Sequence, residues 1–174
     1  MWQTFFTAAM LIVLSGTSSS GKTSLAIAMQ ELSSRPLLHL EADRFAPVLR
    51  PDHPATGDPE FRKRTTVAMH EAIAAFGRSG LDIIVDGSLP TEPELRDACL
   101  AILREVSDTR VIAVRCSVAT LRQREAVRRD RPVGWAEEQA QIVSEGVIFD
   151  ETIDTTNGSS REHASTLLRR LLPA

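Results

Sequence analysis

The sequence is short of cysteine and aromatic residues and has no excess of basic charge, and these shortages exclude several classes of protein. Its 174 residues carry 20 basic and 23 acidic side chains, a formal net charge of −3. A basic field that could hold a nucleic-acid backbone is therefore missing, and we expect no nucleic-acid partner. No apolar run approaches the roughly 18 to 20 residues of a membrane span, which predicts no membrane partner.

Cysteine is represented by only Cys99 and Cys116, without a C-x-x-C pair or a Cys/His cluster. This usage argues against a zinc site or a disulfide framework and favours a reducing compartment, so we expect a cytoplasmic protein. The length fits one domain over residues 1–174, large enough to bury a core.

One motif in this sequence narrows the chemistry more than any other. Residues 16–24 match the pattern G-x-x-x-x-G-K-[ST], in which backbone N–H groups surround phosphates, the lysine reaches the β and γ oxygens and the hydroxyl binds Mg²⁺. This pattern predicts a site for ATP and Mg²⁺. The residues expected to contact the nucleotide are Gly16, Thr17, Ser18, Ser19, Ser20, Gly21, Lys22, Thr23 and Ser24.

The flanks of this loop support the match. An apolar run over 11–14 is typical of a buried strand, and Leu25, Met29 and Leu32 recur on one helical face. The helix would then direct its unpaired N–H groups at the phosphates. A Gly/Ser-rich connector that happens to contain a lysine is the alternative, and the strand-loop-helix order disfavours it.

Further apolar runs at 37–40, 81–86 and 111–114 predict three more strands, and the segment 148–155 is expected to contain a short fifth one; amphipathic helices separate them. Strands that are apolar throughout and alternate with helices are typical of a parallel sheet covered on both faces. We therefore predict an α/β, three-layer P-loop NTPase fold with a five-stranded parallel sheet and a helical lid.

Local signals predict the start and buried face of two helices. Asp58 followed by Pro59 is a helix start, and Met69, Ile73 and Phe76 would supply the buried face of that helix. Thr91-x-x-Glu94 reads as a capping box at the start of the next helix.

Acids at the carboxyl ends of strands are candidates for chemistry, because ligands of such sheets bind there. Asp86 ends an apolar strand and would hold Mg²⁺ together with Thr23, although a turn-capping role is the alternative. Asp43 follows the second strand, where it could take the proton of an acceptor hydroxyl or merely cap a helix. Asp154 is interpreted as structural.

An arginine cluster lies in the C-terminal third. Arg124, Arg128 and Arg131 are spaced to share one helical face, and Pro132 and Gly134 follow as a possible hinge. This face could close over a triphosphate as part of a lid at about 118–135. The alternative is a solvated helix. The four histidines, His39, His53, His70 and His163, are scattered, and the sequence assigns them no chemistry.

These features together resemble the chloramphenicol phosphotransferases, small kinases of the adenylate-kinase-like P-loop group. The resemblance covers nearly the whole chain and rests on the phosphate-binding loop, on Asp43, and on the segments 59–62, 83–86, 114–116, 124–131, 145–150 and 154–156. It implies transfer of the γ-phosphoryl group of ATP to a hydroxyl of chloramphenicol or a related antibiotic. It further implies Asp43 as catalytic base, with Arg128 and Arg131 over the phosphates. From the loop motif we expect Lys22 to be catalytic as well, and from the arginine face we expect Arg124 to contact the nucleotide.

The acceptor side, at about 43–62, departs from that family. The stretch between Asp43 and Phe61 is shorter, and Arg44 and Phe45 replace a small polar and an aliphatic residue. Arg44 would either bind an anionic acceptor or hold Asp43 ionised. Two alternatives follow: a metabolite or sugar-nucleotide kinase of the zeta-toxin or shikimate-kinase type, and a nucleotide-binding switch that phosphorylates nothing.

Overall fold

The computed structural model describes residues 9–45, 49–127, 136 and 142–171, and within them five parallel strands form one sheet. The order across the sheet is β2-β3-β1-β4-β5. The bounds are β1 Met10–Ser15, β2 Leu38–Glu41, β3 Ile83–Gly87, β4 Asp108–Arg115 and β5 Glu151–Asp154. The predicted five-stranded parallel sheet is therefore confirmed.

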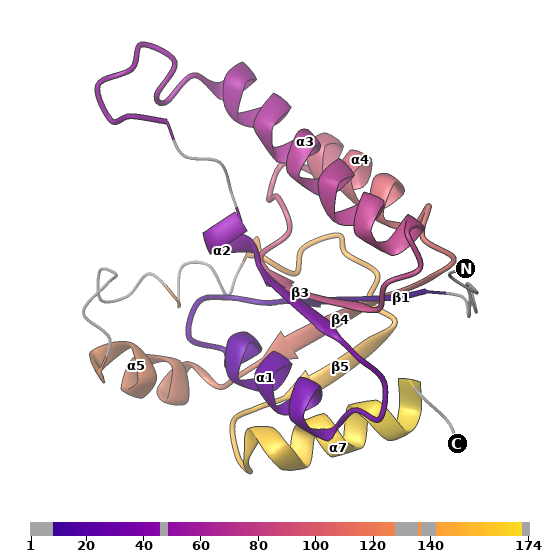
Figure 1. Ribbon diagram of the computed structural model, residues 1–174. Helices are drawn as coiled ribbons and strands as arrows, with labels where there is room; N and C mark the ends of the chain where they lie inside the picture. The colour runs from indigo at the N-terminus through magenta and orange to yellow at the C-terminus, as the bar shows by residue number, and fades with distance from the viewer. Residues whose placement is uncertain (1–8, 46–48, 128–135, 137–141, 172–174) are drawn as a thin grey trace, which may run out of the picture.

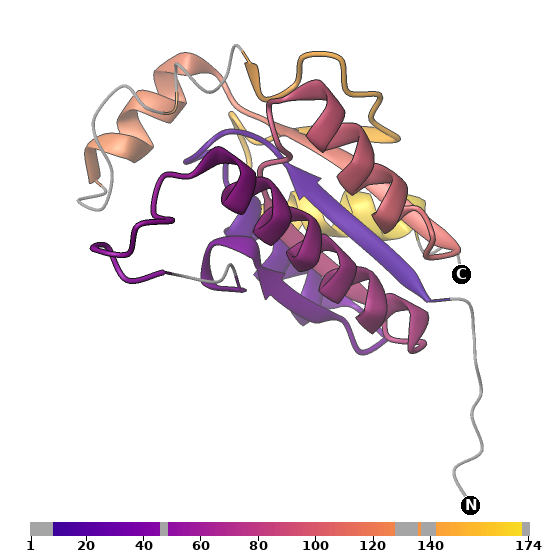
Figure 2. The same cartoon turned by 90° about the horizontal axis from the view of Figure 1, so that it is seen from above.

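Helices cover both faces of this sheet, which makes three layers. In Figure 1, α3 (Pro59–Arg78) and α4 (Pro93–Leu103) lie above the sheet, and α1 (Lys22–Leu32) and α7 (Ser160–Leu171) lie below it. The same layers are seen from above in Figure 2. The short α2 (Ala42–Phe45) follows β2, and α5 (Val118–Val127) extends beyond the carboxyl ends of the strands. The remainder of the predicted lid, residues 128–135, lies outside the described residues.

Successive side chains of a strand point to opposite faces of the sheet, so the core has two parts, one on each face. On β1, Met10, Ile12 and Leu14 pack with α1 and α7, whereas Leu11 and Val13 pack with α3 and α4. Both sets are buried. A strand buried on both faces reads as a continuous apolar run, which is why the sequence reveals these strands clearly.

Helix α3 begins as predicted, and of its predicted core residues Ile73 is buried and Met69 packs partly buried against the core. Its N-cap is Asp58, whose Oδ1 accepts from the backbone N–H of Glu60 at 3.0 Å, and Pro59 follows. The prediction that Phe76 is buried was wrong: it is 36% exposed, while His70 is 6% exposed. Gly77 is in the interface, since a Cβ there would meet Val106 at 2.7 Å. The glycine thus lets α3 approach the connection between α4 and β4, in which Val106 lies.

The predicted capping box at Thr91 is also wrong. Helix α4 begins at Pro93 with Glu92 as N-cap, and no side chain caps it. Proline is favoured in the first turn of a helix, which moves the start two residues past Thr91.

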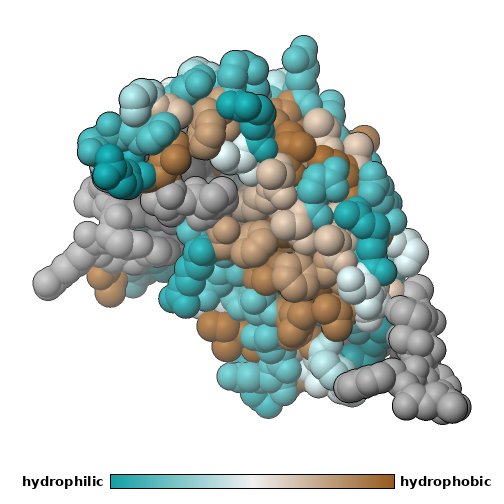
Figure 3. Space-filling view, turned by 45° about the horizontal axis from the view of Figure 1, so that its top comes forward, coloured by the Kyte–Doolittle hydropathy of each residue, from teal (hydrophilic) through white to brown (hydrophobic). Residues whose placement is uncertain are grey.

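The surface retains some exposed apolar side chains. On the face shown in Figure 3, hydrophobic side chains gather near the middle and hydrophilic ones border them. No helix among the described residues has the length and apolar character that crossing a membrane requires.

Candidate active site

The phosphate-binding loop lies between β1 and α1, and two glycines determine its path. A Cβ at Gly16 would lie 2.2 Å from the carbonyl oxygen of Val114, so only glycine lets the loop pass this close to β4. Gly21 has a φ of 93°, in the left-handed region that favours glycine, and it is the N-cap of α1. The loop therefore requires its two glycines for different reasons: close packing at Gly16 and a left-handed backbone at Gly21.

The loop retains unpaired donors that fit an anion. No side chain caps the N-terminus of α1. Among the described residues, the buried hydroxyl oxygens of Ser19 and Ser20 have no hydrogen-bond partner. Buried polar atoms are normally paired, and a helix N-terminus favours negative charge. These observations fit the phosphate groups of a nucleotide.

Lys22 spans this loop from the first turn of α1. Its Nζ donates to the carbonyl oxygens of Gly16 and Thr17 at 2.7 and 2.8 Å. The ammonium therefore lies over the loop at the wall of the cavity, within the part of the site that would hold phosphates.

Asp86 lies where the carboxyl end of β3 meets α1. Its register partner is Leu14 of β1, which faces α1, and this alternation directs the Asp86 side chain to the same face. Thr23 Oγ1 donates to Asp86 Oδ2, and His39 Nε2 of β2 lies 3.0 Å from Asp86 Oδ1. Three elements thus meet at one carboxylate.

The electrostatics of this contact favour an ionised acid. Burial by itself raises the pKa of Asp86, which is 5% exposed. Hydrogen bonds from His39 and Thr23 and the charge of Lys22 outweigh that effect, so the pKa lies below its usual value.

This pair of oxygens also fits a divalent cation. No group of three His, Cys, Asp or Glu side chains with metal-ligand geometry occurs among the described residues. Mg²⁺ does not require one, because it is usually held by one or two carboxylates together with substrate phosphates. Thr23 and Asp86, side by side at the phosphate loop, have the oxygen chemistry it prefers.

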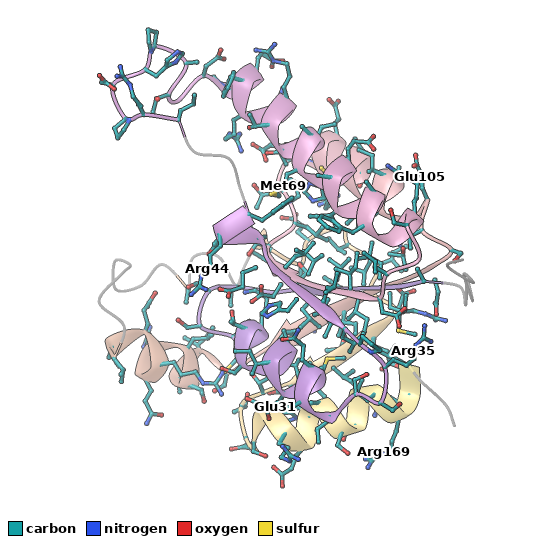
Figure 4. The ribbon with its side chains drawn as sticks, viewed as in Figure 1. Glu31, Arg35, Arg44, Met69, Glu105 and Arg169 are labelled. Atoms are coloured by element: carbon teal, nitrogen blue, oxygen red, sulfur yellow. The ribbon has the colours of Figure 1, made fainter. Side chains whose placement is uncertain are left out.

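The predicted acceptor side begins with α2. Asp43 is exposed and lies in the first turn of this short helix. A Cβ at Gly87 would lie 2.7 Å from Ala42 Cβ, so glycine lets α2 approach the end of β3. Arg44, which Figure 4 labels beside α2, pairs with Glu41 at 3.1 Å. Met69 lies on the opposite side of α2 in that view.

Arg124 joins α5 to the loop and to the end of β5. Its guanidinium donates to Thr155 O at 2.7 Å and to Ser19 O at 3.3 Å. Thr155, in turn, donates its hydroxyl to Ser20 O at 2.6 Å. Arg128 and Arg131 lie outside the described residues, so their positions over the phosphates stay a prediction.

One cavity unites the two sides. It has a volume of about 950 Å³ and opens between the phosphate loop, α2, α5 and the β5–α7 connection. Of the predicted site residues, those that line it are Ser18, Ser19, Gly21, Lys22, Thr23, Ser24, Asp43, Asp86 and Arg124.

Sequence reasoning missed three residues in or behind this cavity. His39 contacts Asp86 from β2, Thr155 braces the loop, and His163 of α7 lines the wall. Thr155 could have been found from the segment 154–156, which is one of the segments that carry the family resemblance. His39 has no local signal, because its contact depends on β2 lying beside β3. Asp154 is exposed and accepts from Thr156 N at 2.7 Å, a local turn contact.

Fold and site define a P-loop kinase of small molecules, and comparison with known proteins places the chain among them. Residues 9–172 match the family model described as "Chloramphenicol phosphotransferase-like protein", and the chain belongs to this family. It is 31% identical to the Mycobacterium tuberculosis (strain H37Rv) protein named "Putative O-phosphotransferase Rv2636", with 90% of this chain and 80% of that protein covered. The chain is therefore a phosphotransferase of the kinase type.

Solved structures support the same fold. A sugar kinase from Janibacter sp. HTCC2649 has a TM-score of 0.69 at 20% identity, covering 96% of this chain and 97% of that one. The Mycobacterium tuberculosis APS kinase CysC, solved with AMPPNP and APS, has a TM-score of 0.67 at 14% identity, with 96% and 99% covered. At these identities the likeness concerns the fold alone.

Proposed function

We propose that this protein transfers the γ-phosphoryl group of ATP to a hydroxyl of a small molecule, with chloramphenicol or a related antibiotic as the acceptor. The observation that carries the proposal is the shared cavity: a carboxylate on the acceptor side, Asp43, faces the same space as Lys22 and Asp86 of the donor side. Antibiotic inactivation as the biological role and a cytoplasmic location are parts of the same proposal.

In this reaction the acceptor hydroxyl gives its proton to the Asp43 carboxylate while its oxygen forms a bond to the γ-phosphorus. The bond from that phosphorus to the β,γ-bridging oxygen breaks, and ADP leaves. Lys22 and the loop N–H groups stabilise the charge that shifts onto the phosphate oxygens. Thr23 and Asp86 would hold Mg²⁺, which when bound neutralises part of that charge. Arg128 and Arg131 are proposed to approach from the lid.

Replacing Asp43 tests the proposed base. Asp43→Asn and Asp43→Ala should lower kcat by roughly 10² to 10⁴, the range for a general base, and leave ATP affinity in calorimetry nearly unchanged. An unaltered kcat on the true acceptor would remove this role.

Arg128→Ala and Arg131→Ala should slow transfer more than they weaken nucleotide binding. If only thermal stability changes, these arginines belong to a solvated helix face.

A second acceptor class has support of its own. By its resemblance to the chloramphenicol enzymes, the stretch from Asp43 to Phe61 is short, and Arg44 beside Asp43 is a cation that an anionic acceptor could contact. Incubation with ATP and a panel of hydroxylated antibiotics, sugars and shikimate, followed by mass spectrometry, distinguishes the acceptors. Tight ATP binding with no phosphorylated product from any compound would favour a nucleotide-binding switch.

A further inference from the structure

The buried histidine on β2 has no assigned role, although it contacts a carboxylate central to the proposed site. His39 and Asp86 side chains are 8% and 4% exposed, and their contact of 3.0 Å joins β2 to β3. An ionised carboxylate can only accept hydrogen bonds, so His39 Nε2 is the donor. His39 is not among the residues that line the cavity, whereas Asp86, which it contacts, is.

Each oxygen of the Asp86 carboxylate therefore has its own donor. His39 takes Oδ1, and the Thr23 hydroxyl takes Oδ2. Oδ2 is thus the oxygen beside the phosphate loop. Turning the carboxylate plane away from His39 would leave a buried donor unpaired, which is costly. The imidazole therefore holds the carboxylate plane in the orientation that directs one oxygen toward Thr23.

We propose that His39 is a positioning residue that orients Asp86 for a divalent cation bound with the nucleotide. This inference rests on the proposed function, because it takes Asp86 and Thr23 as the residues that hold Mg²⁺. Donors to a metal-binding carboxylate commonly change metal affinity by about 10- to 100-fold when they are removed. His39 would thus act on the metal through Asp86 and touch neither nucleotide nor acceptor.

The test compares two substitutions of matched shape. Glutamine can place an N–H donor near the position of His39 Nε2, whereas methionine has similar length and no donor. For wild type, His39→Gln and His39→Met, calorimetry gives the Kd of ADP in EDTA and in Mg²⁺. The Kd in EDTA divided by the Kd in Mg²⁺ reports how strongly metal and nucleotide are coupled, and a ratio of one means no coupling. The readout is binding and needs no acceptor.

His39→Met should reduce this ratio by about tenfold or more, or bring it to one, with the Kd in EDTA unchanged. His39→Gln should keep most of the wild-type ratio. The proposal is overturned if His39→Met keeps the wild-type ratio, if the glutamine variant loses as much as the methionine variant, or if ADP affinity falls equally in EDTA and in Mg²⁺.

Asp86→Asn separates this inference from the proposed function. If Asp86→Asn removes the coupling and His39→Met does not, only the role of His39 is wrong. If Asp86→Asn leaves the coupling intact, the metal site itself is wrong, and the role of His39 is overturned with it. Thermal unfolding of each variant without ligand shows whether a change in coupling accompanies loss of the fold.

Discussion

The donor and acceptor sides of the cavity are built in different ways. The donor side consists of a loop between a buried strand and α1, and its polar groups are held by β4, β3 and the end of β5. The acceptor side consists of a four-residue helix with no buried residue, followed by a connection in which residues 49–58 are mostly exposed. The fold therefore determines the donor side far more closely than the acceptor side.

This difference has a consequence for function. A site for ATP needs the same phosphate contacts in every such kinase, and a rigid backbone supplies them. An acceptor site must differ between enzymes, and exposed loops tolerate such change. We expect substitutions on the donor side to affect stability and chemistry together, and substitutions on the acceptor side to affect acceptor choice or rate with little effect on stability.

The largest expected contrast is in stability. Leu25→Ala removes a side chain of α1 that is 1% exposed and should cost about 2 to 5 kcal/mol of unfolding free energy. Phe45→Ala removes a side chain of α2 that is 37% exposed and should change the unfolding free energy by about 0.5 kcal/mol or less. Urea unfolding of both variants measures the contrast. Equal losses would show that α2 is as firmly packed as α1.

Lys22 tests the donor chemistry. Lys22→Met removes the ammonium over the loop and should lower kcat by about 10² to 10³, since preorganised charge at the transferring group is lost. Lys22→Arg keeps the charge and serves as the control. Steady-state kinetics with a single acceptor give the comparison, and a methionine variant as active as wild type would contradict the role of Lys22.

Gly87 connects the two sides. Gly87→Ala would force α2 away from β3, because the new methyl group would meet Ala42 at 2.7 Å. Asp43 moves with α2, and a displacement of about 1 Å can cost about 10² in rate. In an Asp43→Asn background the same substitution should have little further effect on kcat. Additive losses would mean that Gly87 acts by another route.

The smallest effect concerns pH and His70. Burial lowers the pKa of His70 below 6.5, although its hydrogen bond to Thr66 O, 2.7 Å long, partly opposes this. The unfolded chain then binds a proton at higher pH than the folded one, so this contribution to stability is present above about pH 6.5 and is lost as pH falls through the folded pKa. His70→Asn should lose less unfolding free energy than wild type between about pH 7.5 and 5.5. Urea unfolding at the two pH values measures this loss. If the variant and the wild type lose the same unfolding free energy, the prediction is contradicted.

Much of the fold could be predicted because its signals are local. Strand β1 reads as an apolar run, and the loop motif, the Asp58–Pro59 cap and α1 each depend on neighbours in sequence. The error at Thr91 arose because the local signal of Pro93 outweighed the capping-box pattern. The error at Phe76 arose from packing: Gly77 meets Val106 of the α4–β4 connection, and no helical period contains that information.

The sequence by itself determined the loop, the order of strands and helices along the chain, and the family of phosphotransferases to which it belongs, because these depend on residue types at short spacing. Only the tertiary structure decided that Asp86 meets Thr23 and His39, and that α2 brings Asp43 to the same cavity. The contact of His39 with Asp86 joins strands β2 and β3, which are separated along the chain by α2 and α3. Its physical basis is the lateral order of the sheet, which short-range patterns do not encode.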